Sequence, residues 1–103
     1  MTEETTEETE DKHTPARGLS VADLVRTARE GLRELTGLTA ESVSSFGPAE
    51  GGGWTLEAEV IELARVPDTV SLLATYEVRL DAHGRLTGYR RIRRYERGRA
   101  DPA

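Results

Sequence analysis

The stretch PDTVSLLATYEVRLDAHGRLTGYRRIRRYERGRAD, residues 67–101, decides the fold of this chain of 103 residues. Every second position in its first half is apolar or aromatic, which predicts a half-buried strand; these positions are Leu72, Ala74, Tyr76, Val78 and Leu80. The sequence Asp81-Ala82-His83-Gly84 favours a hairpin turn, because glycine accepts the positive φ that such turns require. A second strand, rich in arginine, then runs from Arg85 to about Tyr95.

Upstream of this hairpin the pattern predicts further strands. Trp54 to Arg65 alternates between apolar and polar residues, and the alternation shifts at Val60-Ile61, which indicates a bulge. Glu41 to Phe46 predicts a short strand, and residues 47–53 (Gly-Pro-Ala-Glu-Gly-Gly-Gly) predict a flexible loop. Successive strands with short connections indicate an antiparallel meander of three or four strands.

The segment from Ser20 to Leu35 predicts an amphipathic helix. Ser20 is a good N-cap, Asp23 is placed to complete a capping box, and Gly37 is a natural C-terminal stop. Gly31 costs about 1 kcal/mol relative to alanine, so we expect it to serve close packing against a neighbour. The predicted fold is α+β, in which this helix packs its apolar stripe on the meander sheet. The stripe consists of Val21, Leu24, Val25, Ala28, Leu32 and Leu35.

Charge is unevenly distributed along the chain. Residues 1–17 carry six acids and two bases with few apolar residues, which predicts a disordered acidic tail ahead of a single domain at residues 18–101. The formal net charge is −5, yet seven of the fourteen basic residues fall between Arg85 and Arg99. Net acidity argues against non-specific coating of nucleic acid. Without cysteine, a membrane-length apolar run or a signal-peptide pattern, we expect a soluble cytoplasmic protein.

Residues that could carry catalysis are few. His13 lies in the acidic tail and His83 in a turn, and neither has the spacing of a metal site or of a nucleophile with its base. Glu57 and Glu59 share one face of a strand, where we expect them to be solvated and paired with arginines of the adjacent strand. The triple glycine at 51–53 lacks the lysine and the strand–loop–helix context of a phosphate-binding loop. The sequence therefore predicts no enzymatic activity, cofactor or metal.

The arginine-rich strand is the candidate binding site. We define the arginine strip as Tyr89, Arg90, Arg91, Arg93, Arg94, Tyr95 and Arg97. Strict alternation divides it between two faces, with Tyr89, Arg91, Arg93 and Tyr95 on one, and Arg90, Ile92 and Arg94 on the other. Charge on both faces indicates an edge strand, and arginine and tyrosine are good interface anchors. We expect the strip to dock an acidic or amphipathic protein surface; alternatively, it protects the sheet edge and pairs with Glu57, Glu59, Glu62 and Glu77.

Two other functions stay open. A regulatory nucleic-acid-binding protein could use the same strip, because tyrosines interleaved with arginines can stack on bases and contact phosphates. A module that binds a small ligand would need a cavity between helix and sheet. There, the small residues Gly31, Ala58 and Ala74 would either leave space or permit close packing.

A series of motifs adds a family resemblance to this interpretation. The most distinctive motif is Leu86-Thr87-Gly88-Tyr89-Arg90-Arg91, closed by Arg94-Tyr95 and Arg97-Gly98. Upstream of it lie Gly53-Trp54, residues 60–63, residues 65–69, residues 74–78, residues 80–84, and the helix with Thr36-Gly37 behind it. Together, in this order and over residues 19–101, these segments resemble the gas vesicle protein O (GvpO) family.

The resemblance implies an accessory protein of gas vesicle formation. It implies no catalytic residues, and a role carried out through contacts with other gas vesicle proteins, among them accessory proteins and the shell. It also implies a place in the cytoplasm in association with the gas vesicle. The arginine strip, which the local chemistry singles out, is the surface that we expect to make these contacts.

Overall fold

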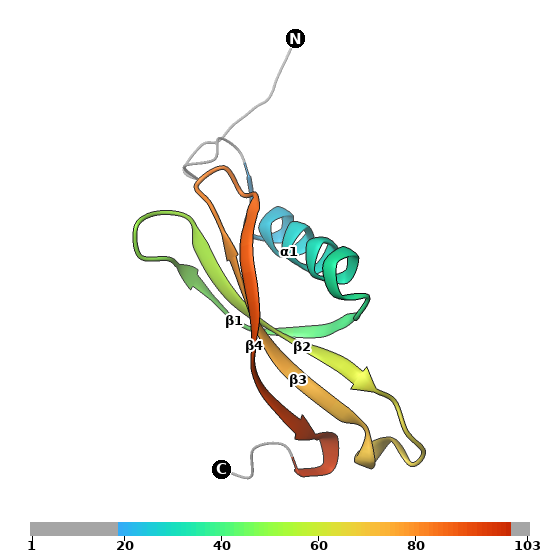
Figure 1. Ribbon diagram of the computed structural model, residues 1–103. Coiled ribbons are helices and arrows are strands. Elements are labelled where there is room, and N and C mark those ends of the chain that lie inside the picture. The colour runs from blue at the N-terminus through green and yellow to red at the C-terminus, as the bar shows by residue number, and fades with distance from the viewer. Residues whose placement is uncertain (1–18, 100–103) are drawn as a thin grey trace.

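The computed structural model describes residues 19–99, which form one helix followed by four strands (Figure 1). The strands pair antiparallel in the order β1-β2-β3-β4, so the predicted α+β fold, a helix ahead of a meander sheet, is confirmed. The predicted disordered tail at residues 1–17 lies outside the described residues. The elements are α1 (Val21–Thr36), β1 (Ala40–Pro48), β2 (Trp54–Leu63), the 3-10 turn η1 (Asp68–Val70), β3 (Leu72–Leu80), β4 (Leu86–Glu96) and the 3-10 turn η2 (Arg97–Arg99).

Both predicted ends of α1 are confirmed. The Asp23 N–H donates to Ser20 Oγ at 3.1 Å, and the Ser20 N–H donates to the Asp23 carboxylate at 3.2 Å, so the capping box is complete. At the other end Gly37 adopts φ 78°, and its N–H donates to the carbonyl oxygen of Arg33 at 2.7 Å. This left-handed cap satisfies one of the last helical carbonyls and ends the helix.

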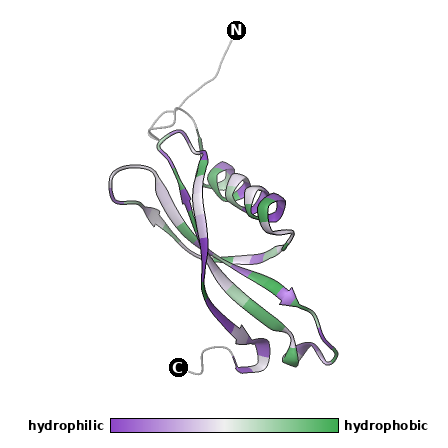
Figure 2. Cartoon of the chain, viewed as in Figure 1, coloured by the Kyte–Doolittle hydropathy of each residue, from purple (hydrophilic) through white to green (hydrophobic). Residues whose placement is uncertain are grey.

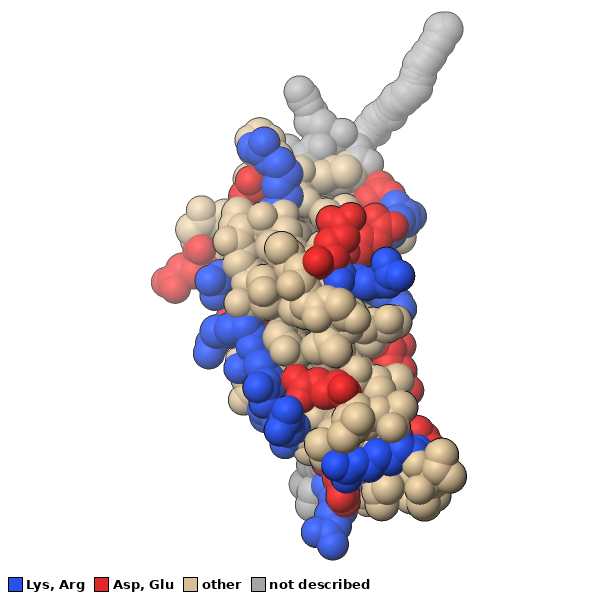
Figure 3. Space-filling view, turned by 45° about the vertical axis from the view of Figure 1, so that its right-hand side comes forward, with Lys and Arg blue, Asp and Glu red and all other residues tan. Residues whose placement is uncertain are grey.

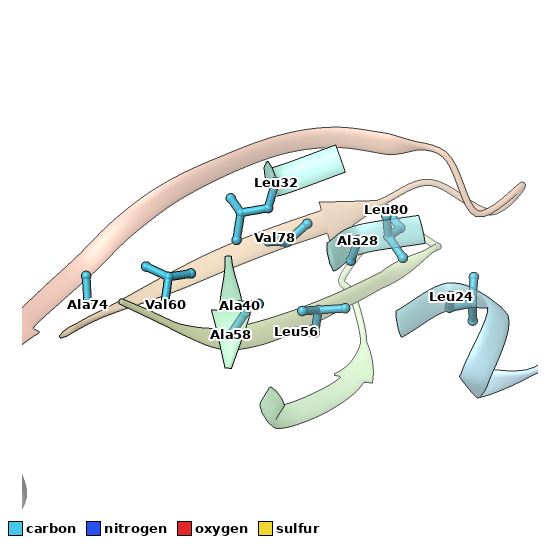
Figure 4. Close-up of a cluster of buried hydrophobic side chains, with 10 residues drawn as sticks. All are labelled: Leu24, Ala28, Leu32, Ala40, Leu56, Ala58, Val60, Ala74, Val78 and Leu80. Atoms are coloured by element: carbon cyan, nitrogen blue, oxygen red, sulfur yellow. The ribbon is translucent and has the colours of Figure 1, made fainter. Parts of the chain in front are cut away.

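The core lies between the middle of α1 and one face of the sheet (Figure 4). Gly31 permits this close approach, because a Cβ on it would lie 2.7 Å from Leu86 Cδ1, so the predicted packing role of Gly31 is confirmed. Val21 and Leu35, predicted to belong to the buried stripe, are 56% and 57% exposed. Both lie in terminal turns of α1, so only the middle of the stripe reaches the sheet. The buried core consists of Leu24, Ala28, Leu32, Ala40, Leu56, Ala58, Val60, Ala74, Val78 and Leu80.

The first two strands differ from the prediction at their ends. β1 runs to Pro48, so Gly47 and Pro48, predicted as loop, pair with the start of β2 instead. Proline is tolerated there because β1 is an edge strand and its nitrogen need not donate to a ladder. The predicted bulge in β2 is present, but the register shift lies between Ile61 and Leu63. β2 ends at Leu63, two residues before the predicted end.

The sheet has two unlike faces. The helix-side face packs Leu56, Val60 and Val78 against α1, whereas the opposite face, here called the open face, carries Glu59 and Thr75 as a cross-strand pair. In the described part of the chain α1 lies beside one end of the sheet, and the other end extends beyond it (Figure 1). Figure 2 shows that the end of β4 beyond the helix is hydrophilic, whereas the neighbouring β3 is largely hydrophobic. That part of β4 carries the arginine strip.

Candidate protein-binding surface

A β-bulge divides the arginine strip between the two faces of the sheet. Thr75 lies opposite Arg93, but the next β3 residue, Tyr76, lies opposite Arg91, so β4 contains one extra residue at Ile92. The prediction that Tyr89, Arg91, Arg93 and Tyr95 share one face is therefore wrong. The observed register places Tyr89, Arg91 and Arg94 on the helix-side face, and Arg90, Arg93 and Tyr95 on the open face.

On the helix-side face, two arginines share the carboxylate of Glu62. Arg94 Nε donates to Glu62 Oε1 at 2.8 Å, and Arg91 Nε lies 3.5 Å from Glu62 Oε2. The Tyr76 hydroxyl donates to Oε2 at 3.4 Å, and the Tyr76 ring lies 6.2 Å from that of Tyr89. The Glu62 side chain is 10% exposed, whereas those of Arg91 and Arg94 are 44% and 51% exposed. One covered carboxylate thus faces two cations that remain in contact with solvent.

A similar shared carboxylate lies on the open face. Arg90 Nε donates to Glu77 Oε1 at 3.0 Å, and Arg79 Nη1 donates to the same oxygen at 3.2 Å. Arg90 and Arg79 are 63% and 50% exposed in their side chains, compared with 24% for Glu77. The predicted pairing with Glu62 and Glu77 is therefore confirmed. Each carboxylate serves two guanidinium groups, so each cluster keeps one unit of positive charge.

Glu59 differs from the prediction, because it is buried and hydroxyl groups hold it. Thr75 Oγ1 and Tyr95 Oη each donate to Glu59 Oε1 at 2.6 Å, and Ser44 Oγ donates to Oε2 at 2.6 Å. Glu59 is 9% exposed, so the prediction of a solvated carboxylate is wrong for this residue. The Arg93 guanidinium lies over the Tyr95 ring, 6.0 Å from its centroid. Sequence reasoning missed Ser44 and Thr75, because neither shares a motif with Glu59.

The hydrogen bonds of this cluster shift two ionisation equilibria. Burial alone would raise the pKa of Glu59, but the hydrogen bonds from the three hydroxyls, with the nearby Arg93 charge, outweigh it and hold that pKa below its usual value. For Tyr95, burial and the hydrogen bond to Glu59 both disfavour the phenolate and raise the pKa to about 12. The hydrogen-bonded state is therefore a carboxylate with a neutral phenol over a wide pH range.

Arg97 has a third kind of environment. Its Nη2 lies 3.0 Å from Glu41 Oε2 and its Nε lies 2.7 Å from Asp68 Oδ2. These contacts link η2 to the start of β1 and to η1, and only 29% of the Arg97 side chain is exposed. Arg97 therefore joins three segments, whereas the shared arginines of β4 project into solvent. Figure 3 shows basic side chains gathered in a column along one border of the molecule, beside a broad uncharged area.

Metal sites, membrane-spanning helices and a cavity between helix and sheet can each be sought among the described residues. Among residues 19–99, no group of three or more histidine, aspartate or glutamate side chains is placed to hold a metal ion. Over the same residues, α1 is too short and too polar to cross a membrane. The small residues Ala58 and Ala74 are buried in the core cluster that α1 shares with the sheet, and Gly31 permits the close approach of Leu86.

Comparison with known proteins identifies the family. The family described as "Gas vesicle synthesis protein GvpO" matches residues 7–101. Gas vesicle protein O of a Streptomyces species is 69% identical over 78 residues, which cover 76% of this chain and 60% of the relative. Gas vesicle protein O of Haloferax mediterranei is 37% identical over 84 residues, which cover 82% of this chain and 60% of the relative.

The alignments cover only part of each relative. Gas vesicle protein O1 of Halobacterium salinarum is 46% identical over 46 residues, which cover 45% of this chain and 39% of the relative. The chain thus spans about three fifths of the length of the first two relatives. No solved structure matches. The match over residues 7–101, together with the two long alignments, shows that the chain belongs to the GvpO family of gas vesicle synthesis proteins.

Proposed function

We propose that this protein is a non-catalytic accessory component of gas vesicle formation that acts through contacts with other gas vesicle proteins. Membership of the GvpO family and two relatives named gas vesicle protein O support this role. The proposal places the protein in the cytoplasm, in association with the gas vesicle. The contacts are assigned to the arginine strip, Tyr89, Arg90, Arg91, Arg93, Arg94, Tyr95 and Arg97.

The observation that carries the contact mechanism is the sharing of carboxylates along β4. Glu62 is divided between Arg91 and Arg94, and Glu77 is divided between Arg90 and Arg79. Exposed ion pairs of this kind contribute about 0–1 kcal/mol each, because solvent and salt screen them. Internal pairing therefore leaves a positive surplus at the border of the sheet, which is available to a partner of opposite charge.

Within the strip, the residues divide between contact and support. Tyr89, 38% exposed, lies with Arg91 and Arg94 on the helix-side face, and a surface of tyrosine and arginine is typical of the centre of protein interfaces. The Tyr95 hydroxyl donates a hydrogen bond to Glu59, and Arg97 forms ion pairs with both Glu41 and Asp68. We therefore assign partner contact to Tyr89, Arg90, Arg91 and Arg94, and the shape of the strip to Arg93, Tyr95 and Arg97.

The test removes the contact charges from the full-length protein. The variant combines Arg90→Gln, Arg91→Gln and Arg94→Gln, and the matched control combines Arg26→Gln, Arg33→Gln and Arg85→Gln, which removes the same charge from exposed positions on α1 and in the β3–β4 hairpin. Tagged proteins are expressed in cells that form gas vesicles but lack the native copy. Co-purifying gas vesicle proteins and cell buoyancy are then measured.

We expect the β4 variant to lose its co-purifying gas vesicle proteins and the control variant to retain them. Circular dichroism of each purified variant establishes that the fold is kept. Equal loss in both variants would mean that only total charge matters, and retention by both would remove the strip as the contact surface. Recovery of nucleic acid instead of gas vesicle proteins by the wild type would favour the nucleic-acid-binding alternative.

A further inference from the structure

The two arginines on the helix-side face contact Glu62 through the same atom of their side chains. Arg94 Nε lies 2.8 Å from Oε1 and Arg91 Nε lies 3.5 Å from Oε2, so each takes one oxygen of the carboxylate. A guanidinium group has five N–H donors, four of them on the terminal Nη atoms. Within residues 19–99, neither arginine donates a hydrogen bond from Nη to another residue. The contact with Glu62 therefore leaves the terminal donors of both side chains available.

Burial separates the two sides of this arrangement. The Glu62 side chain is 10% exposed, and its carboxylate also accepts a long hydrogen bond of 3.4 Å from Tyr76 Oη. The side chains of Arg91 and Arg94 are about half exposed. A largely covered carboxylate thus contacts the Nε ends of two arginines and restrains them. Restraint of this kind reduces the conformational entropy that flexible side chains lose when they bind a partner.

We propose that Arg91 and Arg94 form a binding site for carboxylate groups of an acidic polypeptide segment, and that Glu62 is its positioning residue. This rests on the proposed function and specifies the chemistry of the partner. A guanidinium donor pair matches the two oxygens of a carboxylate. Two arginines that share one glutamate retain one unit of positive charge, which matches the charge of one carboxylate side chain of the partner.

An acidic polypeptide fits this site better than a nucleic acid. A polyphosphate is held by an extended positive field that displaces many counterions, and its affinity grows with the number of phosphates contacted. Here the protein carries a net charge of −5, and Arg91 and Arg94 are partly neutralised by the Glu62 carboxylate that they share. The exposed Tyr89 beside the arginines adds apolar contact area that suits a protein surface.

The positioning role makes a prediction of opposite sign to simple electrostatics. Glu62→Gln removes a negative charge beside the strip, so a purely electrostatic surface would bind an acidic ligand more tightly. If Glu62 instead aims the two arginines, the same substitution weakens binding. Glu57→Gln is the matched control, because Glu57 also lies on β2 and loses the same charge, but it is on the open face and forms no ion pair among the described residues.

The experiment measures fluorescence anisotropy of a labelled oligoglutamate peptide with full-length protein at low ionic strength. We expect Glu62→Gln to bind about threefold more weakly than the wild type, a change typical of a lost exposed ion pair, and Glu57→Gln to bind equally or more tightly. The double variant Arg91→Gln, Arg94→Gln should lose binding by about tenfold or more. Added salt should weaken peptide binding most in the wild type, because that binding depends on the solvent-accessible charges of Arg91 and Arg94.

A second substitution at Glu62 and a second ligand test the positioning role and the ligand class separately. Glu62→Asp retains the negative charge but draws the carboxylate back by one methylene group. A positioning role for Glu62 therefore predicts weaker binding, whereas a purely electrostatic effect predicts unchanged binding. Unchanged or tighter binding by both Glu62 variants overturns the positioning role. Failure of the wild type to bind oligoglutamate, or tighter binding of a labelled oligothymidine, overturns the ligand class. Co-purification from gas-vesicle-forming cells is measured separately. The proposed function is therefore tested independently of the oligoglutamate binding site.

Discussion

Two glutamates three residues apart on β2 have similar burial and opposite surroundings. Glu59 lies on the open face and is 9% exposed, and the Glu62 side chain lies on the helix-side face and is 10% exposed. Three neutral hydroxyls donate to Glu59, from Ser44, Thr75 and Tyr95. Two arginines and one hydroxyl approach Glu62. The identity of the donors therefore distinguishes the two sites more than the depth of the carboxylate does.

The difference separates support of the fold from binding. At Glu59 the hydrogen bonds are short and come from neutral hydroxyl groups on β1, β3 and β4, so the cluster joins these strands to β2 without an ion pair. At Glu62 the donors carry more charge than the acceptor, so the excess is exposed at the surface. Substitutions at Glu59 should change stability, whereas substitutions at Glu62 should mainly change what the surface binds.

The largest effect on stability is expected for Glu59→Ala. The substitution leaves three hydroxyl groups, one of them on the fully buried Thr75, without their acceptor. Loss of a buried acceptor of this kind costs on the order of 3 kcal/mol in the free energy of unfolding. Urea denaturation followed by circular dichroism measures it. Glu57→Ala, on the same face of β2, is the control and should stay within about 0.5 kcal/mol of the wild type; an equal loss there would contradict a special role for the Glu59 cluster.

The same cluster predicts an alkaline transition. The folded-state pKa of Tyr95 lies at about 12, above the usual tyrosine value of 10.0, because burial and the hydrogen bond to Glu59 disfavour the phenolate. The stability from this group is therefore fully present below pH 10 and is lost as the pH rises through about 12. Absorbance at the phenolate band, with Tyr95→Phe as the reference, identifies its titration. In Glu59→Gln the pKa of Tyr95 should fall towards its usual value, and an unchanged pKa would mean that the hydrogen bond is not its cause.

A smaller effect separates two tyrosines. The Tyr95 hydroxyl donates to Glu59 at 2.6 Å, whereas the Tyr76 hydroxyl donates to Glu62 at 3.4 Å. A short hydrogen bond to a charged group contributes about 1.5–3 kcal/mol, and a long bond much less. Thermal or urea unfolding should therefore show a clear loss for Tyr95→Phe and a loss below about 0.5 kcal/mol for Tyr76→Phe. Similar losses would show that bond length does not distinguish the two clusters.

The helix could be predicted because its signals are local. Ser20 and Asp23 are three positions apart, and Gly37 ends the helix through a bond to Arg33. Alternation likewise identified β2 and β3, since period two specifies which residues face the core. Close packing of Gly31 followed from the cost of glycine in a helix, although the sequence did not identify Leu86 as its neighbour.

The candidate surface could be predicted only in composition. Alternating arginine and tyrosine look alike on either side of Ile92, so no residue type marks the bulge that moves Arg93 and Tyr95 to the open face. The Glu59 cluster joins residues separated by 15, 16 and 36 positions, and Glu62 meets Arg94 across 32. Such contacts depend on the register of several strands, and a shift of one residue would exchange the faces.

A small stability effect is expected for Glu62→Gln, and it completes the comparison with Glu59. The arginines that lose their anion are about half exposed, so water and salt ions can solvate them, and the ion pairs contribute about 0–1 kcal/mol. Urea unfolding should show a loss below about 1 kcal/mol that shrinks further at high salt, whereas the loss in Glu59→Ala should persist because its donors are neutral. A salt-insensitive loss as large as that of Glu59→Ala would show that Glu62 supports the fold in the same way. In that case any weaker ligand binding by Glu62→Gln would reflect a damaged sheet rather than misdirected arginines, so the two measurements must be made on the same protein preparations.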